Sequence, residues 1–286
     1  MSLSWSQIFR LGLVQMALGS IVVLTTSTLN RLMVVEFSLP ALLPGALVGL
    51  HYGIQLSRPR WGFRSDVGGN RTRWIIGGMM TLALGGVGAT YAVTLFAVHY
   101  WLALIASIVS YGLIGIGVGA SGTSLLALLA TATAADRRAA AATITWLMMI
   151  FGIALTAGVA GQFLDPYSPQ RLMTVVSVIA LLAILVTVLA IWNIERAVSS
   201  RASEPNNTFQ EALRELWAES KTRNFTIFVF LSMNAYFMQE LILEPYAGLV
   251  FGFTPGQSTS LSGAQNGGVF VGMLTVGIMA TGFKIG

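Results

Sequence analysis

The chain has 286 residues, of which 55% are hydrophobic and only 9% are charged. A soluble domain carries about 25% charged residues, so this composition excludes a soluble enzyme and predicts an all-α polytopic membrane protein. The chain has no cysteine and two histidines. This excludes disulfides and thiol chemistry, leaves too few ligands for most histidine-built metal sites, and leads us to expect no metal.

Eight apolar stretches are long enough to cross a bilayer, because a transmembrane helix needs about 20 such residues. They cover residues 9–30, 38–56, 74–96, 100–131, 140–163, 171–193, 224–244 and 258–283. The fourth is too long for one straight span, so we expect its end to protrude. The first has no small-residue cleavage site and continues into Asn30 and Arg31, so we interpret it as a span and not as a signal peptide.

The basic residues predict the orientation of these spans. With eight spans, fourteen of the sixteen Lys and Arg residues lie on one side, and only Arg31 and Arg171 lie on the other. Basic residues concentrate in cytoplasmic loops, so we expect a cytoplasmic N-terminus. Because the positive charge follows the loops between spans, the net charge of +5 does not indicate nucleic-acid binding.

Polar residues interrupt two of the predicted spans, in Ser27-Thr-Leu-Asn-Arg-Leu-Met-Val-Val-Glu36 and in residues 232–248. A charge at membrane depth costs roughly 2.5–3.5 kcal/mol on insertion scales. We therefore predict that these residues line a cavity or form a gate: Arg31, Glu36, Asn234, Gln239, Glu240 and Glu244. A pair between Arg31 and Glu240 or Glu244 would neutralise both charges. The alternative is that these side chains reach outward to the membrane interface.

The loop between the second and third spans carries the pattern Gly62-x-x-x-Asp66-x-x-Gly69-x-Arg71-x-Arg73. It resembles the signature loop of the major facilitator superfamily, although Val67 stands where that loop has a basic residue. The resemblance implies a cytoplasmic latch, in which the aspartate pairs with arginines and glycines allow a tight turn. An ordinary positively charged loop is the alternative.

Glycines recur within the third and fourth spans. Gly115-x-x-x-Gly119 is typical of close helix packing, and the same is expected of five glycines in the third span: Gly77, Gly78, Gly85, Gly86 and Gly88. The series from Gly112 to Gly122 is not preceded by a strand, so we do not interpret it as a nucleotide-binding loop.

Residues 194–223 form the one long hydrophilic stretch. A linker is followed by a capping box from Thr208 to Glu211, which predicts a short amphipathic helix on the membrane surface or a docking site for a partner. The linker divides the chain into residues 1–193, a bundle of six helices, and residues 224–286, which begin a second bundle. The similar positions of Asn30-Arg31 and Gln239-Glu240 suggest parallel repeats of six spans, as in major facilitators, so we expect a complete form with about twelve spans.

Longer motifs give a more specific resemblance. Thr28-Leu-Asn-Arg-Leu-Met-Val-Val-Glu36, residues 64–78 and residues 240–268 are similar to the PucC/LhaA family, a bacteriochlorophyll delivery branch of the major facilitator superfamily. The resemblance implies a light-harvesting complex assembly factor in the inner (intracytoplasmic) membrane of a photosynthetic bacterium. It implies bacteriochlorophyll as the bound ligand, and antenna polypeptides or a reaction-centre–antenna complex as partners, together with membrane lipid.

His51 is the candidate ligand for that pigment. A neutral imidazole can coordinate the magnesium of a chlorin, but a hydrogen-bonded helix histidine is the alternative. His99 lies beside Tyr100 and Trp101 and is expected in an interfacial aromatic belt.

Two functions therefore stay open. One is antenna assembly with bacteriochlorophyll, and the other is proton-coupled transport of a small amphipathic solute with Glu240 or Glu244 as the proton carrier. A pigment-modifying enzyme lacks support, because the sequence offers no nucleophile–base set and no cofactor fingerprint.

Overall fold

The computed structural model describes residues 2–58, 70–194, 211, 214 and 217–282. All regular structure in these residues is helical. The first rod comprises α1 (Trp5–Val23), η1 (Leu24–Thr28), α2 (Leu29–Arg31) and η2 (Leu32–Glu36). The other long helices are α3 (Leu42–Gln55), α5 (Arg71–Leu95), α6 (Tyr100–Ala132), α7 (Arg138–Leu164), α8 (Pro169–Ile191), α11 (Ser220–Phe251) and α12 (Pro255–Gly282). A short 3₁₀ turn, η3 (Ala135–Arg137), precedes α7.

The prediction of an all-α multi-pass membrane protein is confirmed. In the part of the chain that the structure describes, six helices are long and apolar enough to cross a membrane, namely Trp5–Glu36, Arg71–Leu95, Tyr100–Ala132, Ala135–Leu164, Pro169–Ile191 and Ser220–Phe251. The sequence predicted eight, and the two others do form helices. However, α3 has only 14 residues, and the first half of α12 is rich in Ser, Thr, Gln and Asn.

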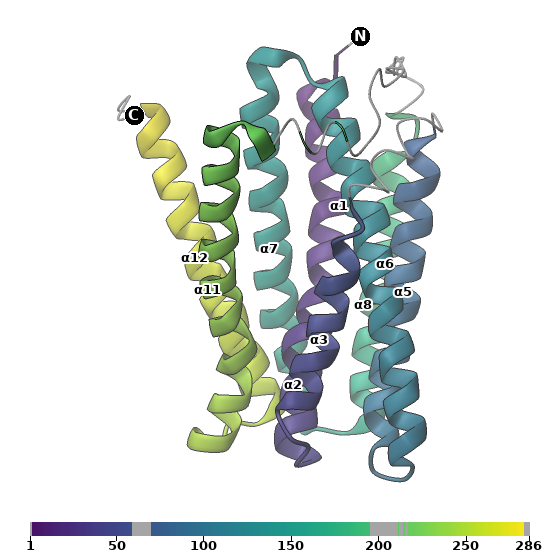
Figure 1. The fold of residues 1–286 in the computed structure, drawn as a ribbon. Coiled ribbons are helices and arrows are strands. Elements are labelled where there is room, and N and C mark those ends of the chain that lie inside the picture. The colour runs from purple at the N-terminus through teal and green to yellow at the C-terminus, as the bar shows by residue number, and fades with distance from the viewer. Residues whose placement is uncertain (1, 59–69, 195–210, 212–213, 215–216, 283–286) are drawn as a thin grey trace.

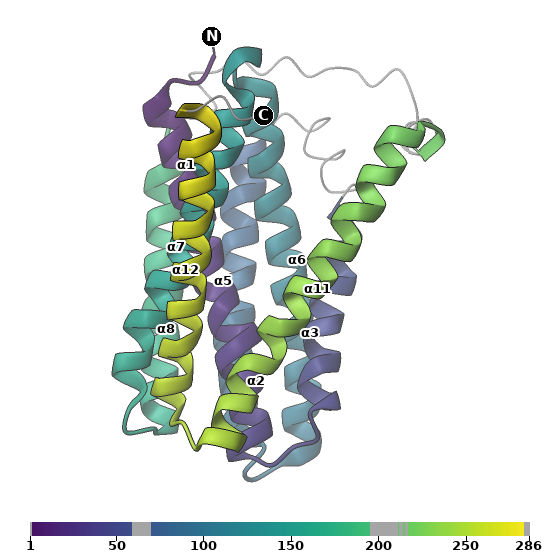
Figure 2. The same ribbon diagram turned by 90° about the vertical axis from the view of Figure 1, so that its left-hand side faces the viewer.

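The helices run side by side, and the N-terminus lies at the same end of the bundle as the far end of α12 (Figure 1). α1 packs against α7 and α8, α5 packs against α6 and α8, α3 lies on α6, and α12 lies on α7. Figure 2 shows that α11 leans across this bundle and leaves it toward its own N-terminal end.

Glycines set the closest helix contacts. A Cβ on Gly78 would lie 2.4 Å from the backbone nitrogen of Ser121, so α5 and α6 touch along their main chains. Gly115 lies against α3, since its Cβ would be 2.7 Å from the carbonyl oxygen of His51. The packing role predicted for Gly78 and Gly115 is confirmed. For Gly77 it is wrong, because a Cβ there would meet open space.

The first rod is not a uniform α-helix. Two π-helical segments, Leu24–Thr28 and Leu32–Glu36, flank the short α2. Each π turn bonds residue i to residue i+5 and changes the direction of the side chains that follow. The rod thereby continues to Glu36, six residues beyond the predicted end, and it places Asn30 and Arg31 inside the bundle, where both are buried.

Two predictions fall largely outside the described residues. Three residues of the predicted latch, Gly62, Asp66 and Gly69, lie outside the described residues. So do most residues of the amphipathic helix that the sequence predicts after Thr208. Arg71 and Arg73 begin α5. Arg71 is buried and donates a hydrogen bond to the hydroxyl of Thr131 on α6, whereas Arg73 is exposed. The latch and the division into two bundles stay predictions.

Candidate functional site

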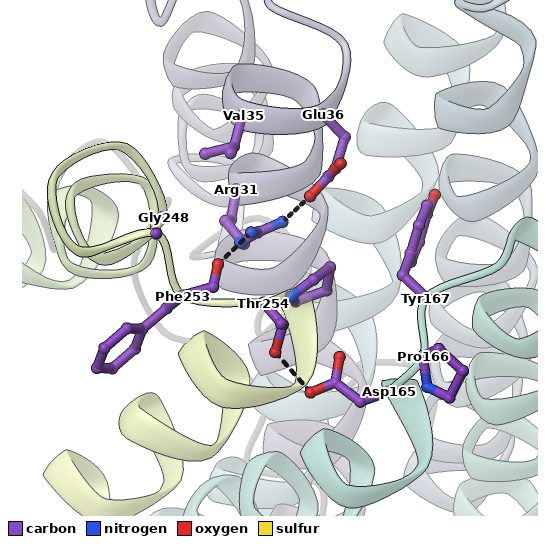
Figure 3. A pocket seen from close by; sticks show the side chains of 11 residues that line it. Arg31, Val35, Glu36, Asp165, Pro166, Tyr167, Gly248, Phe253 and Thr254 are labelled. Carbon is purple, nitrogen blue, oxygen red and sulfur yellow. Dashed lines mark hydrogen bonds and ion pairs between the residues drawn. The ribbon is translucent and has the colours of Figure 1, made fainter.

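Arg31 is the central charged group of the site, and only 1% of its surface is exposed. Its Nη1 donates to Oε1 of Glu36 at 2.7 Å, and its Nη2 donates to the carbonyl oxygen of Phe253 at 2.6 Å (Figure 3). Glu36 follows Arg31 by five residues, which is the spacing that the π turn brings together. The predicted ion pair of Arg31 with Glu240 or Glu244 is not found, because Arg31 pairs with Glu36 within the first rod.

Glu244 is completely buried on α11. Its Oε1 accepts a hydrogen bond from the Ser262 hydroxyl at 2.7 Å, and its Oε2 accepts one from Thr259 at 3.4 Å. The Thr259 hydroxyl also lies 3.1 Å from that of Thr28 in η1. One carboxylate thus connects α11 and α12, and through Thr259 it reaches the first rod. No cation pairs with it among the described residues.

Asn30 compensates for the proline inside α11. Pro245 has no N–H, so the carbonyl of Leu241, four residues earlier, loses its helical hydrogen bond. The Asn30 side chain donates to that carbonyl at 2.8 Å. The neighbouring residues Asn30 and Arg31 therefore hold the C-terminal part of α11. Asn30 bonds to Leu241 within the helix, and Arg31 bonds to Phe253 just after its end.

Asp165, in the loop between α7 and α8, holds the start of α12. Its Oδ2 accepts from the Thr254 hydroxyl at 2.5 Å (Figure 3), and its Oδ1 accepts from the backbone N–H of Gly256 at 3.2 Å. A carboxylate at a helix N-terminus satisfies free N–H groups and complements the helix dipole. Thr254 also forms a reciprocal capping box with Gln257, as the residue pair Thr-x-x-Gln indicates.

These groups surround a pocket of about 630 Å³ at the end of the bundle opposite the N-terminus. It is lined by Arg31, Val35, Glu36, Asp165, Pro166, Tyr167, Gly248, Gly252, Phe253, Thr254 and Pro255. Burial and the nearby carboxylate of Glu36 raise the pKa of Tyr167 above its ordinary value. The pocket therefore combines one guanidinium, two carboxylates and a phenol with apolar walls, which suits a ligand that is apolar with a polar edge.

The structure does not bring all the predicted residues to this pocket. Arg31 and Glu36 line it, whereas Asn234, Gln239 and Glu240 lie further along α11. Asn234 and Gln239 are exposed and Glu240 is half-buried. The amide of Asn234 donates to the carbonyl of Phe230 on its own helix. A cavity or gate role for these three residues stays a prediction.

His51 is buried between α3 and α6, with 1% of its surface exposed. Its Nε2 lies 2.9 Å from Nε2 of Gln55, and its Nδ1 has no hydrogen-bond partner in the described residues. A side chain enclosed in this way does not present a nitrogen to a pigment from the lipid. The described residues also contain no group of three or more His, Cys, Asp or Glu that could hold a metal ion.

Sequence reasoning missed Asp165, Thr254, Thr259 and Ser262. The capping pattern Thr254-Pro-Gly-Gln257 and the serines and threonines of α12 were visible signals. Nothing in the sequence indicated that Asp165 would lie beside Thr254, 89 residues later.

Comparison with known proteins identifies the family to which this chain belongs. A family model described as PUCC protein matches residues 28–286. The chain is 64% identical, over all of its length and 67% of the relative's, to the bacteriochlorophyll synthase 44.5 kDa chain of Rhodobacter capsulatus. It is 28% identical to Protein PucC of Cereibacter sphaeroides, over 97% of this chain and 64% of that protein.

Protein PucC of Rhodobacter capsulatus is also 28% identical, over 90% of this chain and 59% of that protein. The chain thus spans about 60 to 67% of the length of these curated relatives. The family model covers nearly the whole chain, and these relatives match 90 to 100% of it. The chain belongs to the PucC family.

Proposed function

We propose that this protein is a light-harvesting complex assembly factor of a photosynthetic bacterium, which binds bacteriochlorophyll or delivers it to antenna subunits. It works in the inner membrane with its N-terminus in the cytoplasm. The observation that carries this proposal is the PucC family match over residues 28–286, together with a relative named for bacteriochlorophyll synthase. In the chain itself, the supporting observation is a set of buried charged groups among apolar helices.

Handling a pigment needs no chemical step on it. A bacteriochlorophyll offers a large apolar face and a polar rim, and a pocket with fixed donors and acceptors at the end of an apolar bundle can orient such a molecule. We therefore propose a role without catalysis, and the synthase name is said of the relative alone. The enclosed His51 does not fit as the magnesium ligand, so we assign it no role in pigment binding.

The direct test is the absorption spectrum of the purified full chain and the identity of what co-purifies. The proposal expects bound bacteriochlorophyll and antenna polypeptides, and the polypeptides recovered tell whether the core or the peripheral antenna is the client. A colourless protein that purifies without antenna subunits would overturn it.

A cellular test uses Glu240→Gln, because this half-buried acid lies on a membrane helix. We expect antenna levels to fall at equal abundance of the protein. The matched control is Glu219→Gln, an exposed residue just before the same helix, which should leave antenna levels unchanged. Equal antenna levels in both variants would remove Glu240 from the mechanism.

The second candidate function is proton-coupled transport of a small amphipathic solute. The buried carboxylate of Glu244 favours it, since a membrane-embedded acid that accepts from two hydroxyls and forms no ion pair among the described residues is a natural proton carrier. Solute-dependent proton flux in proteoliposomes that Glu244→Gln abolishes would support transport. Pigment binding without such flux supports antenna assembly.

A further inference from the structure

Glu36 has one carboxylate oxygen that is fixed and one that is free. Its Oε1 accepts from Nη1 of Arg31 at 2.7 Å (Figure 3), whereas its Oε2 accepts no hydrogen bond from the described residues. The Glu36 side chain is 36% exposed and lines the pocket of about 630 Å³. Because an ionised carboxylate can bind through both oxygens, Glu36 keeps an oxygen with which it can ligate a molecule in the pocket.

Arg31 holds this carboxylate in place and compensates its charge. The guanidinium is buried and is itself fixed by the carbonyl oxygen of Phe253 at 2.6 Å. The Arg31–Glu36 pair carries no net charge, so a neutral ligand can cover it without leaving an uncompensated buried charge. Protein side chains that ligate a metal are commonly oriented by a second hydrogen-bonded group, and Arg31 occupies that position toward Glu36.

The other acidic and histidine side chains discussed above lack this combination. Asp165 lines the same pocket, but its two oxygens accept from Thr254 and Gly256. Glu244 is completely buried, and its two oxygens accept from hydroxyls of α12. His51 is enclosed against α6 and does not line the pocket. Glu36 therefore differs from these described side chains in having both a free oxygen and access to the pocket.

A single carboxylate suits a magnesium that other ligands already hold. Magnesium prefers oxygen ligands, and a free Mg²⁺ ion needs several of them. The described residues contain no group of three or more His, Cys, Asp or Glu, so they do not offer a free ion a cluster of protein ligands. In a bacteriochlorophyll, by contrast, the ring nitrogens surround the magnesium and leave an axial position open. One carboxylate oxygen is sufficient to fill it.

From this geometry we propose that Glu36 is the axial ligand of the magnesium of a bacteriochlorophyll in the pocket, and that Arg31 positions it. The inference rests on the proposed function and extends it by naming the ligating residue. The volume of about 630 Å³ lies within the range of about 300–1,000 Å³ for small-molecule sites. Val35, Pro166 and Phe253 supply apolar walls for the pigment ring.

The experiment compares two pigments with the full chain in nanodiscs: bacteriochlorophyll, and bacteriopheophytin, the same pigment without its magnesium. Equilibrium binding is followed by absorption. We expect bacteriochlorophyll to bind at least about tenfold more tightly, since loss of a group that only supports a metal ligand already costs about 10- to 100-fold in affinity. Equal binding of the two pigments by the unaltered protein would overturn the inference, and this result needs no variant.

Glu36→Ala should abolish the preference by weakening bacteriochlorophyll binding alone. A loss of equal size for both pigments would show that Glu36 only shapes the pocket, and would also overturn the inference. Glu219→Ala is the matched control, because it removes an exposed acid just before α11, and it should preserve the preference. His51→Ala should preserve it too. If the preference disappears in His51→Ala and persists in Glu36→Ala, the histidine is the ligand.

A free magnesium ion is tested by titrating magnesium chloride alone into the same nanodiscs. We expect no binding that depends on Glu36, and binding that Glu36→Ala abolishes would assign the site to the free ion instead. Failure of the inference is distinct from failure of the proposed function. Equal binding of both pigments leaves pigment handling intact and removes only the ligation by Glu36, whereas binding of neither pigment overturns the proposed function and the ligation together.

Discussion

The two ends of α11 are held very differently. At the end near Pro245, Asn30 bonds to Leu241, Arg31 bonds to Phe253, and the Glu244 carboxylate accepts from α12. At the other end, three phenylalanines face outward with about two thirds of their surface exposed, Phe225 at 67%, Phe228 at 65% and Phe230 at 64%. Figure 2 shows the helix leaving the bundle toward this second end. We call these the anchored end and the free end of α11.

This contrast teaches that polar contacts decide where α11 is fixed. Apolar side chains gain little by moving from lipid to another helix, so association inside a membrane depends on hydrogen bonds and on close contacts of small residues. The anchored end has both, since Gly248 allows the first rod to approach: a Cβ there would lie 2.9 Å from Val35. Among the described residues, the free end has aromatic bulk, but its side-chain hydrogen bonds stay within α11 and no glycine brings another helix close to it.

Removing Arg31 should have the largest effect. Arg31→Met leaves the Phe253 carbonyl and the Glu36 carboxylate without their donor, and breaking a buried ion pair costs about 3 kcal/mol of unfolding free energy. This is the lower part of the range for such pairs, because the Glu36 side chain is 36% exposed. Denaturant unfolding in detergent micelles measures the loss.

The control for this change is Arg73→Met, which removes an arginine that is exposed at the start of α5. We expect its unfolding free energy to stay near that of the unaltered protein. If the two variants unfold alike, the guanidinium does not anchor α11, and the contrast between the two ends loses its main support.

The seam between α7 and α12 should be the next most sensitive. A Cβ on Gly161 would lie 2.2 Å from Oγ of Ser260 and 2.6 Å from the carbonyl oxygen of Gly256. Gly161→Ala therefore forces the helices apart, at a cost of about 2 kcal/mol. Gly158→Ala is the matched control on the same helix, since its Cβ would meet nothing within 4 Å. Equal stability of both variants would show that the seam adjusts freely.

The helices could largely be predicted from the sequence, whereas the partners of the polar residues could not. Apolar runs found all eight helices because their signal is local. The sequence also predicts Arg31 and Glu36 as cavity or gate residues, since a charge in an apolar run can be recognised without a structure. Their pairing could not be predicted, because it depends on the π turn Leu32–Glu36, which no residue pattern indicated.

Contacts between distant segments explain the remaining misses. Pro245 indicated that a carbonyl on α11 would lack its donor, but only the structure identifies Asn30 as the replacement. Asp165 belongs to a loop that carries no motif, and its partners Thr254 and Gly256 lie about 90 residues later. The identity of a partner across the bundle depends on helix packing, which hydrophobic periodicity does not encode.

Loss of the Asp165 carboxylate should have a moderate effect. Asp165→Ala removes the acceptor for the Thr254 hydroxyl and for the backbone N–H of Gly256 at the start of α12. Removal of a capping side chain costs about 1 kcal/mol. Asp136→Ala is the control, because Asp136 is exposed in the short turn before α7. A variant at Asp165 that is as stable as this control would show that Thr254 and Gln257 cap the helix sufficiently by themselves.

The smallest effect is expected at the free end. Phe228→Ala removes a large side chain that is 65% exposed, and substitutions at such positions change stability by about 0.5 kcal/mol or less. The measurement is the same unfolding experiment, and Ala247→Phe at the anchored end sharpens it, because Ala247 is buried and cannot accept the added volume. A loss above about 1 kcal/mol for Phe228→Ala in the purified chain would mean that this phenylalanine is covered in solution. The free end would then be held as firmly as the anchored end, and polar contacts would no longer explain where α11 is fixed.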